Sequence, residues 1–347
     1  MYQALYRKWR PKVFSDVIGQ EHITETLKKQ VAEGRTSHAY LFTGTRGTGK
    51  TTCAKILAKA VNCEHPVNGD PCCQCPSCLG LESGSFLDVL ELDAASNNGV
   101  DQVRALRDEA IYAPANVKKR VYIVDEVHML STAAFNALLK ILEEPPAHLM
   151  FILATTELHK VPATILSRCQ RYSFKRILPK DIAQRLSYVA GQEHIDLTAD
   201  GAELLSRLAD GALRDGLSLL DQCAAAGGTV DSRAVLEVLG LAGNLQTAQL
   251  MRHILDRNAQ AALLLLNELY AGGKDVGAVL GELSTLTRDL LLRKTAPEGG
   301  AALLSGGFDS ATLDQLGKDV PSNRFLYLAS TLQKAAADLY YSADRRT

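Results

Sequence analysis

The sequence has almost no net charge. Its 347 residues include 38 lysines and arginines against 39 aspartates and glutamates, which leaves a formal net charge of −1. Bulk charge therefore does not hold this chain to nucleic acid as it holds a histone, although a local basic face remains compatible with the balance. Residues 1–60 carry such a bias, with eleven basic side chains against four acidic ones, whereas residues 179–347 carry sixteen against twenty-one.

Long apolar runs are also missing. The longest purely aliphatic run, over residues 261–266, is far shorter than the about 20 residues that cross a bilayer. The opening residues 1–8 lack the apolar segment of a secretory signal. We therefore expect a soluble, cytoplasmic protein without a membrane partner, long enough for two or three domains of ~100–200 residues.

Short apolar runs alternate with helical patterns up to about residue 178, which is typical of an α/β fold with a parallel sheet. The expected strands are His38–Thr43, Phe86–Asp93, Val121–Asp125 and Leu149–Thr155. The expected helices between them include Lys50–Val61, Asp101–Ala110 and Ala133–Glu143. The last of these ends before Pro145-Pro146, because a proline ring does not continue a helix.

Strand patterns disappear after Pro179. Residues 179–242 are expected to form a compact helical set that includes Asp200–Leu208 and Leu213–Ala225. Residues 243–347 are rich in alanine and leucine and are helical throughout, for example over Gln246–Leu255 and Ala259–Tyr270. The sequence thus predicts three domains, 1–178, 179–242 and 243–347, and the leucine stripes of the third indicate a helical core or a subunit interface.

A glycine-rich segment follows the first expected strand and precedes a helix. It fits the pattern G-x-x-x-x-G-K-[ST] and reads Gly44-Thr45-Arg46-Gly47-Thr48-Gly49-Lys50-Thr51, with Thr52 next to it. Its backbone N–H groups can surround phosphates, and the helix N-terminus favours negative charge. Lys50 can reach the β- and γ-phosphates, and the Thr51 hydroxyl can hold Mg²⁺. A glycine-rich turn that matches by chance would not need this flanking strand and helix.

An acidic pair follows the strand Val121–Asp125. Because that strand is apolar, it brings Asp125 to the carboxyl edge of the sheet, beside the phosphate loop. Asp125 would position Mg²⁺, and Glu126 would polarise the attacking water. Thr155 and Thr156 end the next strand, where a hydroxyl contacts either the γ-phosphate and its water or a simple turn. These residues predict a hydrolase core for Mg-ATP or Mg-GTP.

Five of the eight cysteines lie between residues 63 and 78. Cys63, Cys72, Cys75 and Cys78 have the spacing C-x8-C-x2-C-x2-C, and four thiolates so spaced can close a tetrahedral Zn²⁺ site. Such a zinc ion would be structural and would fold an insertion too small for a core of its own. Cys73 is a fifth cysteine and His65 a possible substitute ligand, so the ligand set stays open.

The order of the motifs carries a resemblance to a known family. With the phosphate loop and the acidic pair, Ser167-Arg168-Cys169 and the later Gly211-Ala212-Leu213-Arg214-Asp215 resemble an AAA+ clamp loader. The zinc insertion and Tyr6-Arg7-Lys8-Trp9-Arg10-Pro11 narrow the resemblance to the gamma/tau subunits of bacterial DNA polymerase III, over essentially the whole chain. The resemblance implies an AAA+ domain at 1–178, a helical lid at 179–242 and a helical collar at 243–347.

The same resemblance implies an ATPase within a pentameric loader. That loader opens a ring-shaped sliding clamp and places it on primer-template DNA, whose backbone it grips without reading bases. Arg168 would reach in trans into the ATP site of the neighbouring subunit, and Arg214 would contact the γ-phosphate in its own subunit. From the residues alone, each arginine is equally a surface or ion-paired side chain, and Arg214 stands between Asp210 and Asp215.

The family position of the adenine suggests Arg10, Pro11, Val17 and Ile18 as its contacts. From the residues alone, Val17 and Ile18 fit a core, and residues 7–12 fit a basic arm on DNA phosphates. The extra Cys73 departs from the usual four ligands. The chain stops at Thr347, near the expected end of the collar, so we expect a shortened form without the tail that contacts polymerase and helicase in the long form.

Two other functions fit parts of the sequence. Asp125-Glu126-Val127-His128 also occurs in nucleic-acid helicases, but no second motor domain follows residue 178. An ATP-switched scaffold that barely hydrolyses ATP is a third interpretation. The intact Lys50, Thr51, Asp125 and Glu126 argue against such a dead site.

Overall fold

The computed structural model describes residues 3–239, 244–297, 300, 303–305, 307–308 and 310–341. The chain divides into two compact units, Met1–Val189 with Ala209–Asp221, and Ala190–Leu208 with Gln222–Thr347. The domain boundary expected at 178 stays a prediction, and the one at 242 lies outside the described residues.

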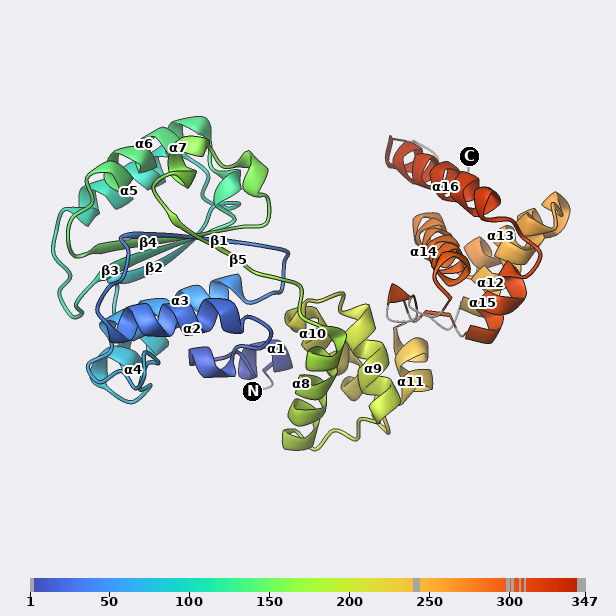
Figure 1. Cartoon of the computed structure of the whole chain (residues 1–347), viewed down its shortest axis with the longest axis horizontal. Helices are drawn as coiled ribbons and strands as arrows, with labels where there is room; N and C mark the ends of the chain where they lie inside the picture. The colour runs from blue at the N-terminus through green and yellow to red at the C-terminus, as the bar shows by residue number, and fades with distance from the viewer. Residues whose placement is uncertain are drawn as a thin grey trace. The chain divides into compact units, whose positions relative to one another are not determined.

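A five-stranded parallel sheet forms the centre of the first unit (Figure 1). Its spatial order is β2-β3-β4-β1-β5, and its strands are β1 (Ala39–Thr43), β2 (Val89–Asp93), β3 (Arg120–Asp125), β4 (Leu149–Thr155) and β5 (Gln170–Ser173). The predicted parallel α/β fold is thus confirmed. The expected second strand begins three residues late, since Leu87 and Asp88 form a turn. The fifth strand was not predicted, because its polar residues Gln170–Ser173 show no apolar alternation; pairing with β1 makes it a strand.

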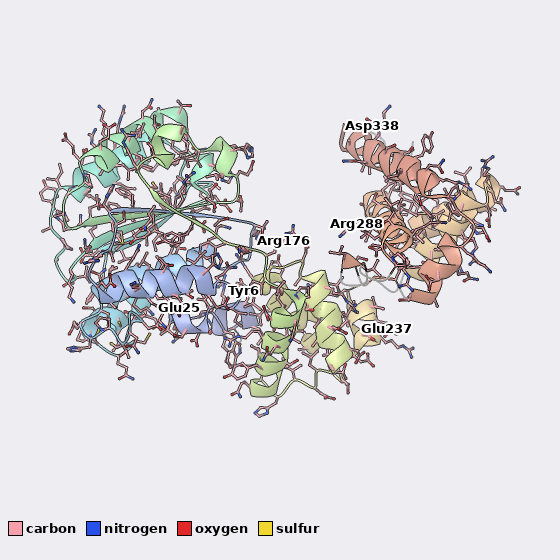
Figure 2. The ribbon with its side chains drawn as sticks, viewed as in Figure 1. Tyr6, Glu25, Arg176, Glu237, Arg288 and Asp338 are labelled. Carbon is pink, nitrogen blue, oxygen red and sulfur yellow. The ribbon has the colours of Figure 1, made fainter. Side chains whose placement is uncertain are left out.

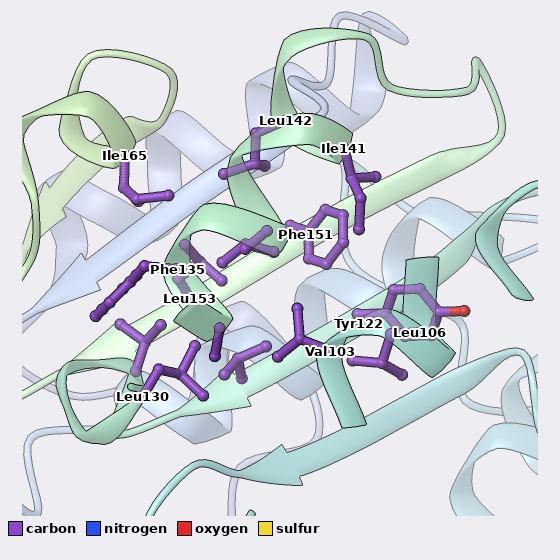
Figure 3. Close-up of a cluster of buried hydrophobic side chains, with 14 of the residues drawn as sticks. Val103, Leu106, Tyr122, Leu130, Phe135, Ile141, Leu142, Phe151, Leu153 and Ile165 are labelled. Carbon is purple, nitrogen blue, oxygen red and sulfur yellow. The ribbon is translucent and has the colours of Figure 1, made fainter. Parts of the chain in front are cut away.

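Helices cover both faces of this sheet. The face with α2 (Glu21–Ala32), α3 (Lys50–Asn62) and α4 (Pro76–Ser83) lies opposite the face with α5 (Val100–Ala110), α6 (Thr132–Glu143) and α7 (Ala163–Leu166) (Figure 1). Every residue of β1 and β4 is buried, as a strand covered on both faces requires. Figure 3 shows Val103 and Leu106 from α5 near Tyr122 of β3, and Phe135 from α6 near Leu153 of β4, all in the cluster that packs against this sheet.

Local sequence signals explain where these helices begin. Ser131 caps α6, since its hydroxyl accepts a hydrogen bond from the Ala134 N–H. In α3 the buried Cys53, Ile56, Leu57 and Ala60 follow the helical spacing i, i+3, i+4 and i+7, so one stripe of the helix faces the sheet. The other elements of the first unit are α1 (Leu5–Lys8), η1 (Phe14–Asp16), η2 (Val127–Met129), η3 (Leu158–Lys160) and most of α8 (Pro179–Gln192) and α10 (Leu213–Ala225).

The described part of the second unit is almost entirely helical, as predicted. Its helices are α9 (Ala199–Leu208), α11 (Ser232–Val238), α12 (Asn244–Leu255), α13 (Ala259–Ala271), α14 (Val276–Thr295), α15 (Ser310–Gly317) and α16 (Ser322–Tyr341). Leu283, Leu286 and Leu290 of α14 are buried in one cluster with Leu313 of α15 and Phe325 of α16. Arg288 and Asp338 mark α14 and α16 in Figure 2. Among the described residues, no helix is both long and apolar enough to cross a membrane.

The register of the sheet brings the predicted site residues to one edge. Thr43 at the end of β1 is paired with Thr155 of β4, and Asp93 of β2 is paired with Asp125 of β3. Because all five strands run in the same direction, their carboxyl ends meet at this edge. The loops that follow β1, β3 and β4 therefore start side by side.

Candidate nucleotide and metal sites

The loop after β1 has a backbone that requires glycine. Gly44 has a φ of 144°, and a Cβ at this position would lie 2.5 Å from the Phe174 carbonyl oxygen. Gly49 has a φ of 103° and precedes α3 without any side chain to cap the helix. The first N–H groups of α3 are thus left for an incoming acceptor, and the helix dipole favours an anion there.

Lys50 is folded back onto this loop. Its ammonium donates hydrogen bonds of 2.9 and 2.8 Å to the carbonyl oxygens of Gly44 and Thr45, and the residue is buried. Burial lowers the pKa of Lys50, and the nearby Glu126 and Asp125 carboxylates oppose that shift. A bound phosphate would give this buried ammonium a negatively charged partner.

Thr51 and Asp125 are the predicted magnesium ligands, and they are in contact. The Thr51 hydroxyl donates a 2.7 Å hydrogen bond to Oδ2 of Asp125. One residue lies in the first turn of α3 and the other ends β3. A hydroxyl and a carboxylate that converge next to a phosphate loop are the oxygen donors that Mg²⁺ prefers, so this pair fits the ion.

Glu126 is held by the loop that follows β4. Its Oε2 accepts hydrogen bonds from the Thr156 backbone N–H at 3.1 Å and from the Thr156 hydroxyl at 2.8 Å. Glu126 itself has a φ of 47°, a left-handed conformation that is uncommon for a residue with a side chain. Thr155 instead serves the turn, since its hydroxyl oxygen accepts the Glu157 N–H at 3.0 Å. The two threonines therefore have different contacts, which the sequence left open.

A cavity of about 560 Å³ joins these groups. Its size lies within the range of ligand pockets. Its lining includes the predicted phosphate-loop and acidic residues Arg46, Gly47, Thr48, Gly49, Lys50, Thr51, Thr52, Asp125 and Glu126, the predicted adenine contacts Arg10, Pro11, Val17 and Ile18, and Arg214. The sequence did not predict Tyr6, Arg7, Trp9, Ile177, Leu213 and Leu217, which also line the cavity.

Arg214 stacks on an aromatic ring in this cavity. Its guanidinium carbon lies 4.9 Å from the centroid of the Tyr6 ring, a cation–π contact. Asp210, one of the two acidic residues beside Arg214 in the sequence, forms an ion pair with Arg176. Tyr6 and Arg176 are both labelled in Figure 2. Arg10 reaches the helix after the phosphate loop, where its Nε donates to the Thr52 hydroxyl at 3.2 Å.

Arg168 does not line the cavity of its own chain. It follows α7, donates to the Thr164 carbonyl oxygen at 2.8 Å and forms a 2.7 Å ion pair with Glu143. Its side chain is 33% exposed. Burial raises the pKa of the neighbouring Cys169 to about 12, so this thiol is protonated at neutral pH.

The four predicted zinc ligands form one cluster. The sulfurs of Cys63, Cys72, Cys75 and Cys78 all lie within 4.8 Å of one another, and two of these distances are 4.0 Å. Four sulfurs at about 2.3 Å from a zinc ion would lie about 3.8 Å apart, so the spacing fits zinc. Neither His65 nor Cys73 belongs to the cluster, and the Cys73 sulfur instead lies 3.7 Å from the Lys12 carbonyl oxygen.

Helix ends hold this cluster in place. Cys63 follows the last residue of α3, Cys75 caps α4, and Cys78 lies in the first turn of α4, a helix that the sequence analysis missed. Backbone N–H groups of Gln74 and Cys75 donate to the Cys72 sulfur and lower its pKa to about 6, whereas burial raises the pKa of Cys63 and of Cys78. Metal binding needs thiolates, so donors aimed at sulfur suit a metal site. Cys53 and Cys223, which lie in helices away from this cluster in the sequence, are also buried.

Comparisons with known proteins identify the family. A family model described as "DNA polymerase III, delta subunit" matches residues 19–177, one described as "DNA polymerase III clamp loader subunit, ATPase lid domain" matches 181–229, and one described as "DNA polymerase III subunits gamma and tau domain III" matches 230–347. The chain is 46% identical to the DNA polymerase III subunit tau of Bacillus subtilis, over 98% of this chain and 61% of that protein. It is 42% identical to the tau subunit of Escherichia coli, over 99% of this chain and 54% of that protein.

A shorter relative matches over most of both chains. The DNA polymerase III subunit gamma of Buchnera aphidicola is 41% identical over 81% of this chain and 78% of its own length. Among solved structures, the RuvB Holliday junction branch migration motor of Thermotoga maritima has a TM-score of 0.52 at 17% identity, over 72% of this chain and 80% of that one, a likeness of fold alone. The matches in sequence and in domain order show that the chain belongs to the gamma/tau family of DNA polymerase III clamp-loader subunits, which are AAA+ ATPases.

Proposed function

We propose that this chain is an ATP-driven motor subunit of a clamp loader, which places a sliding clamp on primed DNA for the DNA polymerase III holoenzyme. The observation that carries the proposal is the convergence of Lys50, Thr51, Asp125 and Glu126 on one cavity. We assign the nucleotide-binding domain to 1–178, the lid to 179–242 and the collar to 243–347. The chain spans only 61% and 54% of the two tau relatives, so functions of their remaining length lie outside this proposal.

Each group at the cavity has a role in phosphoryl transfer. The first N–H groups of α3 and the Lys50 ammonium bind the phosphates of ATP. Thr51 and Asp125 would hold Mg²⁺, which would supply positive charge to neutralise the phosphates. Glu126 accepts hydrogen bonds through one oxygen from Thr156, so its carboxylate is oriented to polarise the attacking water. Proper orientation matters because reacting atoms must lie within about 3–3.5 Å.

Other residues of the cavity lining would bind the adenine base and the γ-phosphate. The apolar Pro11, Val17 and Ile18 suit the adenine ring, with Arg10 beside them. On nucleotide binding, Arg214 would leave the Tyr6 ring for the γ-phosphate. Both arrangements use the same guanidinium, so the lid helix α10 that carries Arg214 would respond to the γ-phosphate.

A neighbouring subunit completes the site. Arg168 lies outside its own chain's cavity and is partly exposed, so it is available to the ATP of the next subunit in a ring. An arginine supplied in trans stabilises charge in the transition state and is worth on the order of 10³–10⁵ in rate. Hydrolysis would then depend on assembly, which links ATP turnover to contact with the clamp and with primer-template DNA.

The partners of this motor are other loader subunits in a pentamer, the sliding clamp and the backbone of primed DNA. Basic residues of the first domain would contact phosphates without base readout. A zinc ion at Cys63, Cys72, Cys75 and Cys78 would stabilise the insertion and take no part in catalysis.

ATP hydrolysis by the full chain tests this proposal. It is measured alone and then with partner subunits, clamp and primed DNA, for the unchanged chain and for Arg168→Ala. Arg171→Ala is the matched control, because Arg171 is an exposed arginine three residues away on β5. We expect strong stimulation that Arg168→Ala abolishes while ATP still binds, and that Arg171→Ala leaves intact.

Two results would contradict the proposal. A rate of ATP hydrolysis that does not change when clamp and primed DNA are added would contradict the loader function. An unchanged rate in the assembly with Arg168→Ala would contradict the role of Arg168 in trans. Displacement of a DNA strand by the purified chain would favour the helicase interpretation instead.

A further inference from the structure

His128 has no role in the proposed chemistry, yet its side chain is buried. It lies in the short helix η2, directly after the buried Val127. Its imidazole is 6% exposed. A buried imidazole needs partners for both ring nitrogens, because an unpaired buried polar atom is costly.

Both ring nitrogens face oxygen atoms of residues at the carboxyl edge of the sheet. Nδ1 lies 3.0 Å from the Thr155 hydroxyl oxygen and 3.4 Å from Oε2 of Glu126. Nε2 lies 3.4 Å from Oε1 of Glu157. The imidazole thus stands between the carboxylate proposed to polarise water and a second carboxylate in the loop after β4.

The second carboxylate is itself fixed. The Glu157 N–H donates to the Thr155 hydroxyl oxygen at 3.0 Å, and the Glu157 carboxylate forms a 2.8 Å ion pair with Lys160. Lys160 is also the main cause of the lowered pKa of Glu157. The imidazole is therefore held on its outer side by a carboxylate that stays ionised at neutral pH.

On its Nδ1 side the imidazole contacts Glu126, the carboxylate proposed to polarise the attacking water. Glu126 has a φ of 47°, a left-handed backbone conformation that is uncommon for a residue with a side chain and that clusters at functional sites. Its Oε2 is shared by Thr156 and by His128. His128 does not line the nucleotide cavity, and of the three residues whose oxygens face its ring (Thr155, Glu126 and Glu157) only Glu126 does. We therefore expect an effect of the imidazole on hydrolysis to act through Glu126.

We infer that His128 is a positioning residue that, through the contact of its Nδ1 with Glu126 Oε2, orients this carboxylate toward the attacking water. The inference rests on the proposed ATPase function, and it adds a role for a residue that neither binds nucleotide nor reacts. Loss of the Nδ1 contact should lower kcat and leave ATP binding unchanged, because Glu126 is proposed to act on the attacking water and not to bind the nucleotide.

Three variants separate the two ring nitrogens. His128→Asn keeps a polar atom near the position of Nδ1, His128→Gln keeps one near Nε2, and His128→Phe keeps neither. We expect Phe and Gln to lower single-turnover hydrolysis about 10- to 100-fold and Asn to restore most of it. ATP affinity, measured with a fluorescent analogue, should stay within about twofold. A packing role predicts another order, in which Gln, the larger amide, performs at least as well as Asn.

The control is His159→Phe. His159 also faces the Glu157 carboxylate, at 3.6 Å, but its side chain is 76% exposed, so this variant should hydrolyse ATP at the normal rate. A double-mutant cycle with Glu126→Gln tests the route. If His128 acts through Glu126, the Phe variant adds no further loss in the Glu126→Gln background.

The outcomes distinguish this inference from the proposed function. Equal hydrolysis by the unchanged chain and Glu126→Gln would contradict the proposed catalytic role of Glu126 itself. With that difference present, full activity of His128→Gln, or a further loss from His128→Phe on top of Glu126→Gln, overturns only the positioning role. Thermal unfolding of each variant identifies a folding defect. If His128→Phe proves unstable, the comparison of His128→Asn with His128→Gln decides whether His128 positions Glu126.

Discussion

The hydroxyl of Thr51 donates a 2.7 Å hydrogen bond to the carboxylate of Asp125, although 74 positions separate the two residues. The contact arises because the helix after β1 and the end of β3 meet at one edge of a parallel sheet. It brings together two oxygen donors that suit Mg²⁺.

Asp125→Asn should lower ATP hydrolysis at least ~100-fold, because several kcal/mol of charge stabilisation would depend on the Mg²⁺ ion that this carboxylate is proposed to hold. Hydrolysis measured against Mg²⁺ concentration should also show a higher Mg²⁺ requirement. Asp93→Asn, at the end of the neighbouring strand β2, is the matched control and should change neither quantity. Equal loss in both variants would argue for a general effect on the sheet edge.

Thr156→Val should reduce kcat about tenfold and leave ATP affinity unchanged. The valine keeps the shape and the backbone N–H but removes the hydroxyl that donates to Glu126 at 2.8 Å, and one charge-assisted hydrogen bond is worth about 1.5–3 kcal/mol. Single-turnover hydrolysis and fluorescent ATP binding measure the two effects. Thr132→Val, at an exposed threonine in α6, serves as control. A weakened ATP affinity with normal kcat would mean that Thr156 serves binding instead.

Cys78→Ser should release zinc and lower the melting temperature, since a structural zinc site contributes directly to folding. Cys73→Ser should do neither, because its sulfur lies outside the four-cysteine cluster. Zinc content per chain and thermal unfolding check both variants. Loss of zinc from Cys73→Ser would place the fifth cysteine among the ligands.

Asp200→Asn should lower the melting temperature modestly at pH 7. Interactions with the Thr198 and Ser232 side chains and with the Ser232 N–H, which donates to Oδ2 at 3.0 Å, hold the pKa of Asp200 well below its ordinary value, because they stabilise the charged carboxylate. A lowered carboxyl pKa means stabilisation that is present above about pH 4, the ordinary value, and is lost as the pH falls toward the folded-state value. The difference between the two proteins should therefore shrink in acid.

Melting curves from pH 7 to 3 follow this difference. The effect should also weaken at high salt, because Asp200 is exposed. A gap between the two proteins that stays constant or widens in acid would show that the carboxylate is not the source.

Local sequence patterns predicted the parts of the site that follow one another along the chain. Gly44 to Thr51 specify a strand, a loop and a helix within a few residues, so the phosphate loop needs no distant partner to be recognised. The strand that ends at Asp125 is likewise marked by its own run of apolar residues. The cysteine spacing predicted the four sulfurs that the fold brings together.

Distant contacts carry the features that sequence analysis missed. The strand β5 consists of polar residues and becomes a strand only by pairing with β1. Tyr6 and Leu217 come from opposite ends of the first unit's chain and reach one cavity only because the chain folds back. The sequence places Arg214 near two acidic residues that could pair with it, whereas in the fold its guanidinium lies over the Tyr6 ring.

The sequence by itself thus determined the chemistry of this protein: a phosphate loop, two carboxylates and four thiolates, each recognisable because short-range backbone preferences are encoded locally. Only the tertiary structure decided which side chains act on one another. Thr156 rather than Thr155 holds Glu126, and the imidazole of His128 lies between two carboxylates. These contacts depend on the register between β3 and β4, which long-range packing sets and a linear pattern does not specify.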